Sequence, residues 1–316
     1  GVGCFLETAR GAPQEGVSIR FTELGKIEIR VGTESNGQGH ETTFKQIAST
    51  RLGVPIEDLE YIQADTERVA IGFGHGGARS MHMGAGTMAL AIDSAIEKAS
   101  RVAATLLQTD IEELSFDKGA FLTRKDQRSV SIIEVASAAR NSDIMPSLGE
   151  NGIDTFYKRE EAPFTFPNGC HAAEVEIDPD TGSLTLVNYV MVDDYGSLVN
   201  PALTEGQLHG GVVQGIGQAL EEFVAFDPET GQLLSGSLMD YTAPRAASFP
   251  FFKAHFQGVP TEANLLGVKG VGQAGCIAAP QVITHAVLNA LQEYNIDHIQ
   301  MPITSQSLWR SIQAAS

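Results

Sequence analysis

Two segments of the chain share an order of patterns that constrains the fold more than any other feature of the sequence. In residues 17–31, apolar residues occupy alternate positions on both sides of Leu24-Gly25-Lys26, which is the period of a hairpin with one buried face. Residues 173–192 repeat this alternation around a turn at residues 178–182. A helix start marked by glycine and glutamine follows each hairpin. The sequence therefore predicts an α+β fold with two related subdomains, each with antiparallel hairpins packed on helices.

Helical spacing of apolar residues predicts three helices in addition. One face of the first carries Phe44, Ile47, Ala48 and Leu52. This helix should end at Gly53, which suits the position after a helix C-terminus. The other two span about residues 87–108 and 279–291. Between Arg124 and Phe156 the chain is polar and irregular, and we expect the boundary between two domains there, at residues 1–145 and 146–316.

The charge and the cysteine content exclude several classes of function. A formal net charge of -18 argues against nucleic-acid binding, because a phosphate backbone is repelled. No stretch has the length of apolar residues that a membrane-spanning helix needs. The cysteines, Cys4, Cys170 and Cys276, are too few for a four-thiolate iron–sulfur cluster and indicate no disulfide framework. This usage fits a reducing, cytoplasmic compartment, with export of a folded complex as the alternative.

Three glycine-rich loops are candidate ligand sites: residues 32–41, residues 72–80 and residues 267–276. Each precedes a predicted helix, whose first N–H groups can hold a phosphate or a pterin edge, and the glycines allow close approach of the backbone. The second loop has neither the Gly-Lys-Ser/Thr of a P-loop nor a Rossmann fingerprint. An ordinary structural turn is the alternative at each loop, with Gln38 capping its own backbone in the first.

The order of these loops carries a specific resemblance, because Gly211-Val-Val-Gln214-Gly-Ile-Gly217 lies between the second and the third. Together they resemble the molybdopterin-binding domain of the xanthine oxidase and aldehyde oxidoreductase family, the molybdenum hydroxylases. Further matching stretches are residues 174–178, Val199-Asn200-Pro201, Gly206-Gln207, residues 236–245, Ile296-Asp297 and Met301-Pro302. The resemblance implies the C-terminal half of a molybdopterin-binding large subunit, with the fold of that domain.

The resemblance also implies which residues contact molybdopterin or its cytosine dinucleotide. These are Gln38, Gly39 and His40 of the first loop, Gly76, Gly77, Ala78, Arg79, Ser80 and His82 of the second and the turn after it, Gln214, and Lys269, Gly270, Val271 and Gly272 of the third. In this family the dithiolene of the pterin holds the molybdenum, so no metal ligands from the protein are expected.

One position departs from the family pattern. In the family, a catalytic glutamate follows this loop and accepts a proton during hydroxylation. In this chain the residue after Gly272 is Gln273. A neutral amide can orient a group by hydrogen bonding but cannot accept its proton near pH 7. Gln273 is therefore the candidate catalytic position and also the main argument for a non-catalytic protein.

The resemblance implies a multi-subunit enzyme that oxidises an aldehyde, an N-heterocycle or a related small substrate with water as the oxygen source. An N-terminal half of similar size would supply the rest of the active site, as a separate chain or as the remainder of a longer one. Separate iron–sulfur and FAD subunits would carry the electrons, since we expect neither group in this chain.

Two other hypotheses stay open. The first is a cofactor-binding or assembly subunit that has lost the catalytic base. The second is a nucleotide-binding α/β enzyme, which the missing P-loop lysine and the hairpins argue against.

Overall fold

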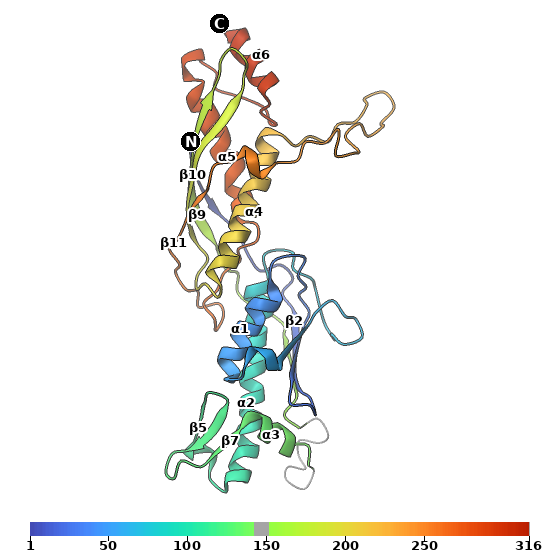
Figure 1. Cartoon of the computed structure of the whole chain (residues 1–316), viewed down its shortest axis with the longest axis vertical. Helices are drawn as coiled ribbons and strands as arrows, with labels where there is room; N and C mark the ends of the chain where they lie inside the picture. The colour runs from blue at the N-terminus through green and yellow to red at the C-terminus, as the bar shows by residue number, and fades with distance from the viewer. Residues whose placement is uncertain (142–151, 316) are drawn as a thin grey trace. The chain divides into compact units, whose positions relative to one another are not determined.

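The computed structural model describes residues 1–141 and 152–315, and the chain forms two compact units within it (Figure 1). Unit 1 consists of Gly1–Thr8, Phe166–Val259 and Val271–Ser316. Unit 2 consists of Ala9–Thr165 and Pro260–Gly270. The predicted boundary between residues 145 and 146 lies outside the described residues, and the two units differ from the contiguous domains expected from the sequence because each is built from separate segments.

Unit 2 contains a four-stranded sheet in the order β4-β3-β2-β8. Its strands are β2 (Glu15–Phe21), β3 (Ile27–Val31), β4 (Leu59–Ile62) and β8 (Thr155–Arg159). The hairpin of β2 and β3 pairs Val17 with Val31 and Phe21 with Ile27, so the alternate apolar residues share one buried face. The first predicted hairpin is therefore confirmed. β4 pairs parallel to β3, which requires the crossover that the first helix provides.

Two helices of unit 2 follow the expected spacing. α1 (His40–Leu52) ends at Gly53, whose φ of 65° is the left-handed conformation that glycine adopts without strain. α2 (Gly86–Leu107) packs against β2 and β8 through a face rich in alanine. A π-helical turn, Ser80–Ala85, leads directly into α2. The second glycine loop therefore ends on this turn.

A smaller three-stranded sheet follows α2 in unit 2, in the order β5-β6-β7. It consists of β5 (Leu114–Asp117), β6 (Ala120–Thr123) and β7 (Ser129–Ser131), and α3 (Ile132–Ala138) comes directly after it. The expectation of irregular chain was wrong here. Ser131 caps the helix, and Glu134 completes a reciprocal capping box, a signal that the polar composition concealed.

Unit 1 repeats this plan with a second four-stranded sheet, in the order β1-β9-β10-β11. Its strands are β1 (Val2–Leu6), β9 (Asn168–Ile177), β10 (Leu184–Asp194) and β11 (Lys253–Phe256). The helices are α4 (Pro201–Leu220), α5 (Ala274–Ala290) and α6 (Ser305–Ala315). The second predicted hairpin is confirmed, and α5 begins five positions earlier than the expected residue 279 because the chain turns into the helix at Gln273.

The two units share one topology: a hairpin, a helix, a strand parallel to the second hairpin strand, and a second helix packed on the sheet. An antiparallel strand completes each sheet beside the first hairpin strand. In unit 2 this strand is β8, which follows α2, whereas in unit 1 it is β1, from the start of the chain. Because β1 belongs to unit 1, and Pro260–Gly270 belongs to unit 2, no single boundary along the chain separates the units.

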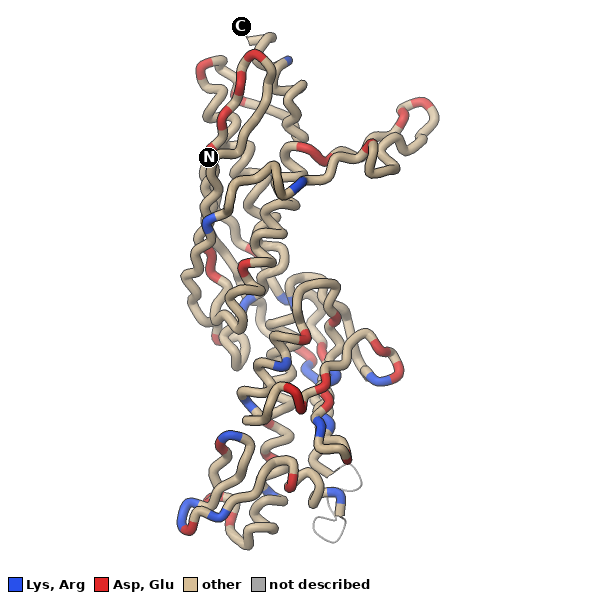
Figure 2. Tube along the Cα trace, in the orientation of Figure 1, with Lys and Arg blue, Asp and Glu red and all other residues tan. Residues whose placement is uncertain are grey.

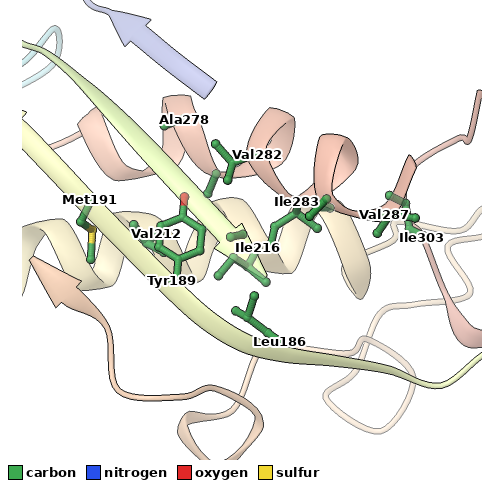
Figure 3. Close-up of a cluster of buried hydrophobic side chains, with 14 of the residues drawn as sticks. Leu186, Tyr189, Met191, Val212, Ile216, Ala278, Val282, Ile283, Val287 and Ile303 are labelled. Carbon is green, nitrogen blue, oxygen red and sulfur yellow. The ribbon is translucent and has the colours of Figure 1, made fainter. Parts of the chain in front are cut away.

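The core of unit 1 lies between its sheet and the pair α4 and α5 (Figure 3). Leu186, Tyr189 and Met191 of β10 face Val212 and Ile216 of α4 across this core. Burial of side chains of this size stabilises the fold by about 1.5–3 kcal/mol each. The helices α4 and α5, which carry the candidate site residues of unit 1, are therefore anchored to its sheet by this core.

Short 3-10 turns complete the secondary structure at Ile56–Asp58, Ile111–Glu113, Ala246–Ser248 and Gln292–Tyr294. Within the described residues, no helix combines the length and the apolar character needed to cross a membrane. Acidic side chains outnumber basic ones, 39 to 21, and occur in both units (Figure 2).

Candidate functional site

The first glycine loop turns from β3 into α1. Gly37 and Gly39 have positive φ values, 124° and 75°, which a residue with a Cβ rarely adopts. The side-chain oxygen of Gln38 accepts hydrogen bonds from the Asn36 backbone N–H at 2.6 Å and from the Ser35 hydroxyl at 3.1 Å. Gln38 thus holds its own loop, as the structural alternative predicted, and one end of its amide is occupied by the chain itself.

His40 is the first residue of α1 and is only 4% exposed. Its Nδ1 has no hydrogen-bond partner among the described residues. Burial, reinforced by the neighbouring His75, lowers the pKa of His40 to about 4, and Glu34 offsets part of this effect. The imidazole is therefore neutral at pH 7, with one ring nitrogen left to pair with something outside this part of the chain.

The second glycine loop is fixed by a buried arginine. Arg79 is fully buried, and its guanidinium donates to Glu15 at 2.8 Å and to the carbonyl of Gly74 at 2.7 Å. The same side chain also donates to the carbonyl oxygens of Gln14, at 2.5 Å, and Ala12, at 3.4 Å. Both terminal nitrogens of the guanidinium are occupied by the chain, and the buried Nε has no partner among the described residues. Arg79 therefore shapes the loop rather than presenting its charge to a ligand.

The backbone of this loop turns through three residues of positive φ: Gly74 at 68°, Gly77 at 85° and Ala78 at 51°. A Cβ at Gly77 would lie 2.6 Å from the Cα of Gly11, so two backbones touch there. A Cβ at Gly76 would meet nothing within 4 Å. The loop is therefore anchored at Gly77 and open at Gly76, where successive backbone N–H groups can form an anion-binding nest.

Two contacts join the first and second loops. The hydroxyls of Thr33 and Ser80 lie 2.8 Å apart, and Thr33 is fully buried. His75 Nδ1 lies 2.9 Å from a carboxylate oxygen of Glu34. Both loops therefore form one cluster at the start of α1 and at the π-helical turn before α2.

His82, in that π-helical turn, is bracketed by two backbone segments. Its Nε2 donates to the carbonyl of Pro163 at 2.8 Å, and its Nδ1 accepts from the side-chain amide of Asn264 at 2.9 Å. Burial lowers the pKa of His82 to about 4, with the carbonyl of Pro163 acting in the opposite direction. The neutral ring therefore connects the Pro163 and Asn264 segments, and neither ring nitrogen is left for a ligand.

The third glycine loop begins in the same cluster. Asn264 also donates to the carbonyl of Val268 and accepts from the Val268 and Leu266 backbone N–H groups, which shapes the turn before Lys269. A Cβ at Gly270 would lie 2.6 Å from the Cβ of Ala78, so only glycine fits over the second loop. Lys269 is half-buried. Unit 2 thus gathers the first loop, the second loop and the start of the third.

The other predicted site residues belong to unit 1, on α4 and at the start of α5. These helices pack closely through small residues, since a Cβ at Gly211 would lie 3.2 Å from the Cys276 backbone nitrogen. Gln214 is exposed on α4, one turn after Gly210, where a Cβ would meet nothing within 4 Å. The side of α4 that carries Gln214 is therefore free of other side chains of unit 1 at that point.

Gln273 is exposed and immediately precedes α5. Its carbonyl accepts the first hydrogen bond of the helix, from Ile277 at 3.1 Å, while its side chain makes no capping bond. Gly272 before it is also exposed, and half-buried Val271 accepts a bond from Ala274. A side chain at this position lies at the positive end of a helix dipole, which favours negative charge.

Three residues that position the loops gave no signal in the sequence. Glu15 is a fully buried acid at the start of β2, and Asn264 lies in a stretch without a motif. Glu34 contacts a histidine far along the chain. Their roles depend on partners that only the fold brings near. Among residues 1–141 and 152–315, no group of three or more His, Cys, Asp or Glu side chains is placed to hold a metal ion.

Comparison with known proteins identifies the family. The model of the molybdopterin cofactor-binding domain matches residues 1–250 of the chain. The chain belongs to this family. The resemblance of the glycine loops to molybdenum hydroxylases is therefore confirmed, and so is the predicted α+β fold of their molybdopterin cofactor-binding domain.

Curated relatives include large subunits of such enzymes. The domain is 31% identical to the carbon monoxide dehydrogenase large chain of Hydrogenophaga pseudoflava over 93% of this chain and 36% of that one. It is 33% identical to the nicotine 6-hydroxylase large subunit of Paenarthrobacter nicotinovorans, with the same coverage. The crystal structure of Cu,Mo-CO dehydrogenase in its carbon monoxide reduced state superposes with a TM-score of 0.92 at 29% identity, over all of this chain and 41% of that one. The chain thus spans well under half of these proteins' length.

The geometry of unit 2 fits a bound pterin. His40 has a buried Nδ1 without a partner in the described part of the chain, close to the free N–H groups at the start of α1. Glycines 37 and 76 border open space, so a flat ligand can approach the backbone at both loops. These features provide polar contacts and space for a pterin, and none of them is a charged side chain.

Proposed function

We propose that this chain binds molybdopterin as part of a molybdenum hydroxylase that oxidises a small organic substrate. One observation carries the proposal: in a chain of the molybdopterin cofactor-binding family, unit 2 joins two glycine loops near the beginning of α1, and the start of the third loop packs on the second. A structural turn alone explains Gly37 through its positive φ, but it has no need of the open Gly76 or of the unpaired Nδ1 of His40.

The proposed cofactor residues divide into two kinds. The residues proposed to contact the cofactor directly, through the backbone or the side chain, are Gln38, Gly39, His40, Gly76, Gly77, Ala78, Gln214, Lys269, Gly270, Val271 and Gly272. Arg79, Ser80 and His82 act through the shape of the second loop, because the terminal guanidinium nitrogens of Arg79, the Ser80 hydroxyl and both ring nitrogens of His82 are paired within the chain. The bound group would supply a metal that takes up two electrons from the substrate. We extend the proposal to its cytosine dinucleotide form, since open glycine loops suit a diphosphate.

For the substrate we propose an aldehyde or an N-heterocycle. A relative at 33% identity is named for the hydroxylation of nicotine, an N-heterocycle. In this chain, Gln273 takes the position of the family's general base. Its exposed amide can donate and accept hydrogen bonds to orient a polar substrate atom. Proton acceptance would require another group.

We also propose that the chain works with further polypeptide: the N-terminal half of a large subunit, an iron–sulfur subunit and an FAD subunit. Support comes from the segment between α4 and β11, which extends away from the rest of unit 1 (Figure 1). It carries Phe223, Val224, Phe226, Leu238, Met239 and Phe251, all more than half exposed. Exposed apolar side chains in this number are typical of a surface that another chain covers.

We also propose a cytoplasmic location, which the few cysteines favour.

Metal and pterin analysis tests the proposal. We expect the chain co-purified with the products of neighbouring genes to contain molybdenum and a pterin that fluoresces after oxidation, whereas the chain alone should contain little of either. A co-purified complex without pterin would refute cofactor binding. Near-stoichiometric molybdenum in a monomeric preparation of the chain alone would refute the dependence on partners.

A second candidate function is favoured by Gln273: a cofactor-holding subunit without turnover. This hypothesis shares every cofactor contact and differs only in the missing carboxylate. Turnover assays on the cofactor-loaded complex separate the two, because a non-catalytic subunit retains molybdopterin while substrate stays unchanged.

A further inference from the structure

Two cysteines that are far apart in the sequence lie side by side in unit 1. β1 pairs antiparallel with β9, and in this register Cys4 stands directly opposite Cys170. Both cysteines are free and exposed. Their neighbours Phe5 and His171 are buried on the opposite face of the sheet, so both thiols project from the face that does not pack on α5.

The register places the pair at a position that suits a disulfide. Gly1 and Ala173 exchange both backbone hydrogen bonds, at 2.8 and 2.9 Å, and Glu7 donates to Pro167 at 2.9 Å. Because hydrogen-bonded and non-hydrogen-bonded pairs alternate along an antiparallel ladder, Cys4 and Cys170 form a non-hydrogen-bonded pair. Such pairs have Cα atoms about 4.5 Å apart, within the range of about 4.4–6.8 Å found in disulfides.

The two thiols also interact. A hydrogen bond with Cys4 raises the pKa of Cys170, and partial burial acts in the same direction. A raised pKa keeps Cys170 protonated, which leaves Cys4, on the edge strand, to react first. The arrangement therefore distinguishes an attacking thiol from a resolving one.

We propose that Cys4 and Cys170 form a reversible dithiol–disulfide site that exchanges with small disulfides of the glutathione type. The Cys4 thiolate attacks one sulfur of the small disulfide, which breaks its S–S bond and releases one thiolate. Cys170 then attacks the Cys4 sulfur of the mixed disulfide and displaces the second thiolate. Two protein thiols are oxidised, one small disulfide is reduced to two thiols, and the two thiol protons pass to the departing thiolates.

The bond would tie the first strand of the chain to β9. It would close a loop that contains all of residues 9–165, the main part of unit 2. β1 is an edge strand, paired on one side only, and such strands open more readily than central strands because fewer contacts hold them. Oxidation at this site is therefore expected to hold β1 in the sheet of unit 1.

Cys276 provides an internal control. It is half-buried at the start of α5, and burial raises its pKa. It should therefore react slowly and without a partner. Trypsin separates the three cysteines, since cleavage yields peptides 1–10, 160–245 and 270–310.

The test incubates the purified, reduced chain with oxidised glutathione, blocks the remaining thiols at acidic pH, and maps tryptic peptides by mass spectrometry. We expect peptide 1–10 linked to peptide 160–245 within monomers, in at least about tenfold excess over any link to peptide 270–310, because the paired thiols have a high effective concentration. Reduction should reverse the link, and the oxidised chain should unfold at a higher temperature.

Serine variants sharpen the result. Cys170→Ser should trap the mixed disulfide on Cys4, whereas Cys276→Ser should leave the link unchanged. Stable glutathione adducts on both cysteines of the parent chain, or links only between different molecules, would overturn the proposal. Equal linking of Cys4 to Cys170 and to Cys276 would overturn it as well.

Discussion

The two units share one topology but present their candidate site residues in opposite ways. In unit 2 three of the candidate side chains are paired within the chain: Arg79 with Glu15, His82 with Asn264, and Ser80 with Thr33. In unit 1 the candidates Gln214 and Gln273 are exposed, on a pair of helices held together by small residues. Unit 2 therefore presents loop backbone to a ligand, and unit 1 presents exposed amide side chains.

This difference teaches that a motif residue need not touch the ligand. Internal pairs in unit 2 fix loops whose glycines and N–H groups make the contacts, so their loss should first lower stability. The exposed amides of unit 1 support nothing in their own unit, so their loss should change only binding or turnover. Four predictions test this difference between the units.

The largest effect is expected at Gln273. If the complex hydroxylates by the route of its family, Gln273→Glu should raise turnover by about 10²–10⁴-fold, the contribution of a placed general base. The rise should follow one ionisation with a pKa at or below the free value of about 4.3, because the position is exposed at a helix N-terminus. Steady-state rates across pH measure it. Gln218→Glu, the same change at an exposed position of α4, should leave turnover unchanged.

Either of two results at Gln273 would contradict this view. A parent complex that already turns over quickly, with no gain in Gln273→Glu, would show that another group acts as the base. A fully loaded complex without turnover in both forms would favour the non-catalytic subunit.

The next effect concerns the buried ion pair of unit 2. Arg79→Met should lower the free energy of unfolding by about 3–5 kcal/mol, because Glu15 is left buried without its partner. Burial already raises the pKa of Glu15, with Arg79 acting against it, so Glu15 should take up a proton in the variant. Urea unfolding gives the measurement. Arg20→Met, which removes the partly exposed pair with Asp154, is the matched control at about 0–1 kcal/mol. Equal losses in both variants would refute the role of Arg79.

A pH dependence should separate the units too. His40 and His82 of unit 2 have pKa values lowered to about 4, below the free value of about 6.5. The unfolded chain therefore binds protons that the folded chain does not, and stability falls as pH drops below 6.5. At pH 5 each histidine should cost about 2 kcal/mol. Unfolding measured from pH 7 to 5 tests this. His82→Gln should flatten the slope, because the group that takes up a proton only after unfolding is removed. An unchanged slope in His82→Gln would contradict the burial effect.

The smallest effects compare the two glutamines. Gln38→Leu and Gln214→Leu should each weaken cofactor retention by about 1–3 kcal/mol, because a polar edge of the pterin loses its partner. Only Gln38→Leu should also lower the stability of the cofactor-free protein, by about 1 kcal/mol, since Gln38 holds its own loop. Molybdenum content and thermal unfolding measure the two effects. Gln218→Leu serves as the control on α4. Full retention in both variants would show that neither amide contacts the cofactor.

Much of this architecture could be predicted from local patterns. The period-two alternation located both hairpins, and the apolar spacing with Gly53 located α1 and its end. The capping box of α3 was missed because Ser131 and Glu134 lie in a stretch whose overall composition is polar. The start of α5 was missed because its first turn consists of small residues with little periodicity.

The candidate site divides in the same way. The glycine content of the three loops predicted them as candidate sites, because backbone that contacts another backbone or a ligand closely has no room for a Cβ. The roles of the side chains in these loops could not be predicted from the sequence. Arg79 and His82 resemble ligand contacts in sequence, yet each is occupied by partners, Glu15 and Asn264, that lie far along the chain.

The local elements and the family pattern follow from the order of residues along the chain, because they depend on neighbouring residues and on spacing. Which polar groups are buried and paired follows from the folded chain alone, since burial depends on contacts between distant segments. The tertiary structure also decided that the first strand of the chain completes the second sheet, and hence that Cys4 faces Cys170. Strand pairing is made by backbone hydrogen bonds, which are common to all sequences, so the partner of β1 could not be read from its residues.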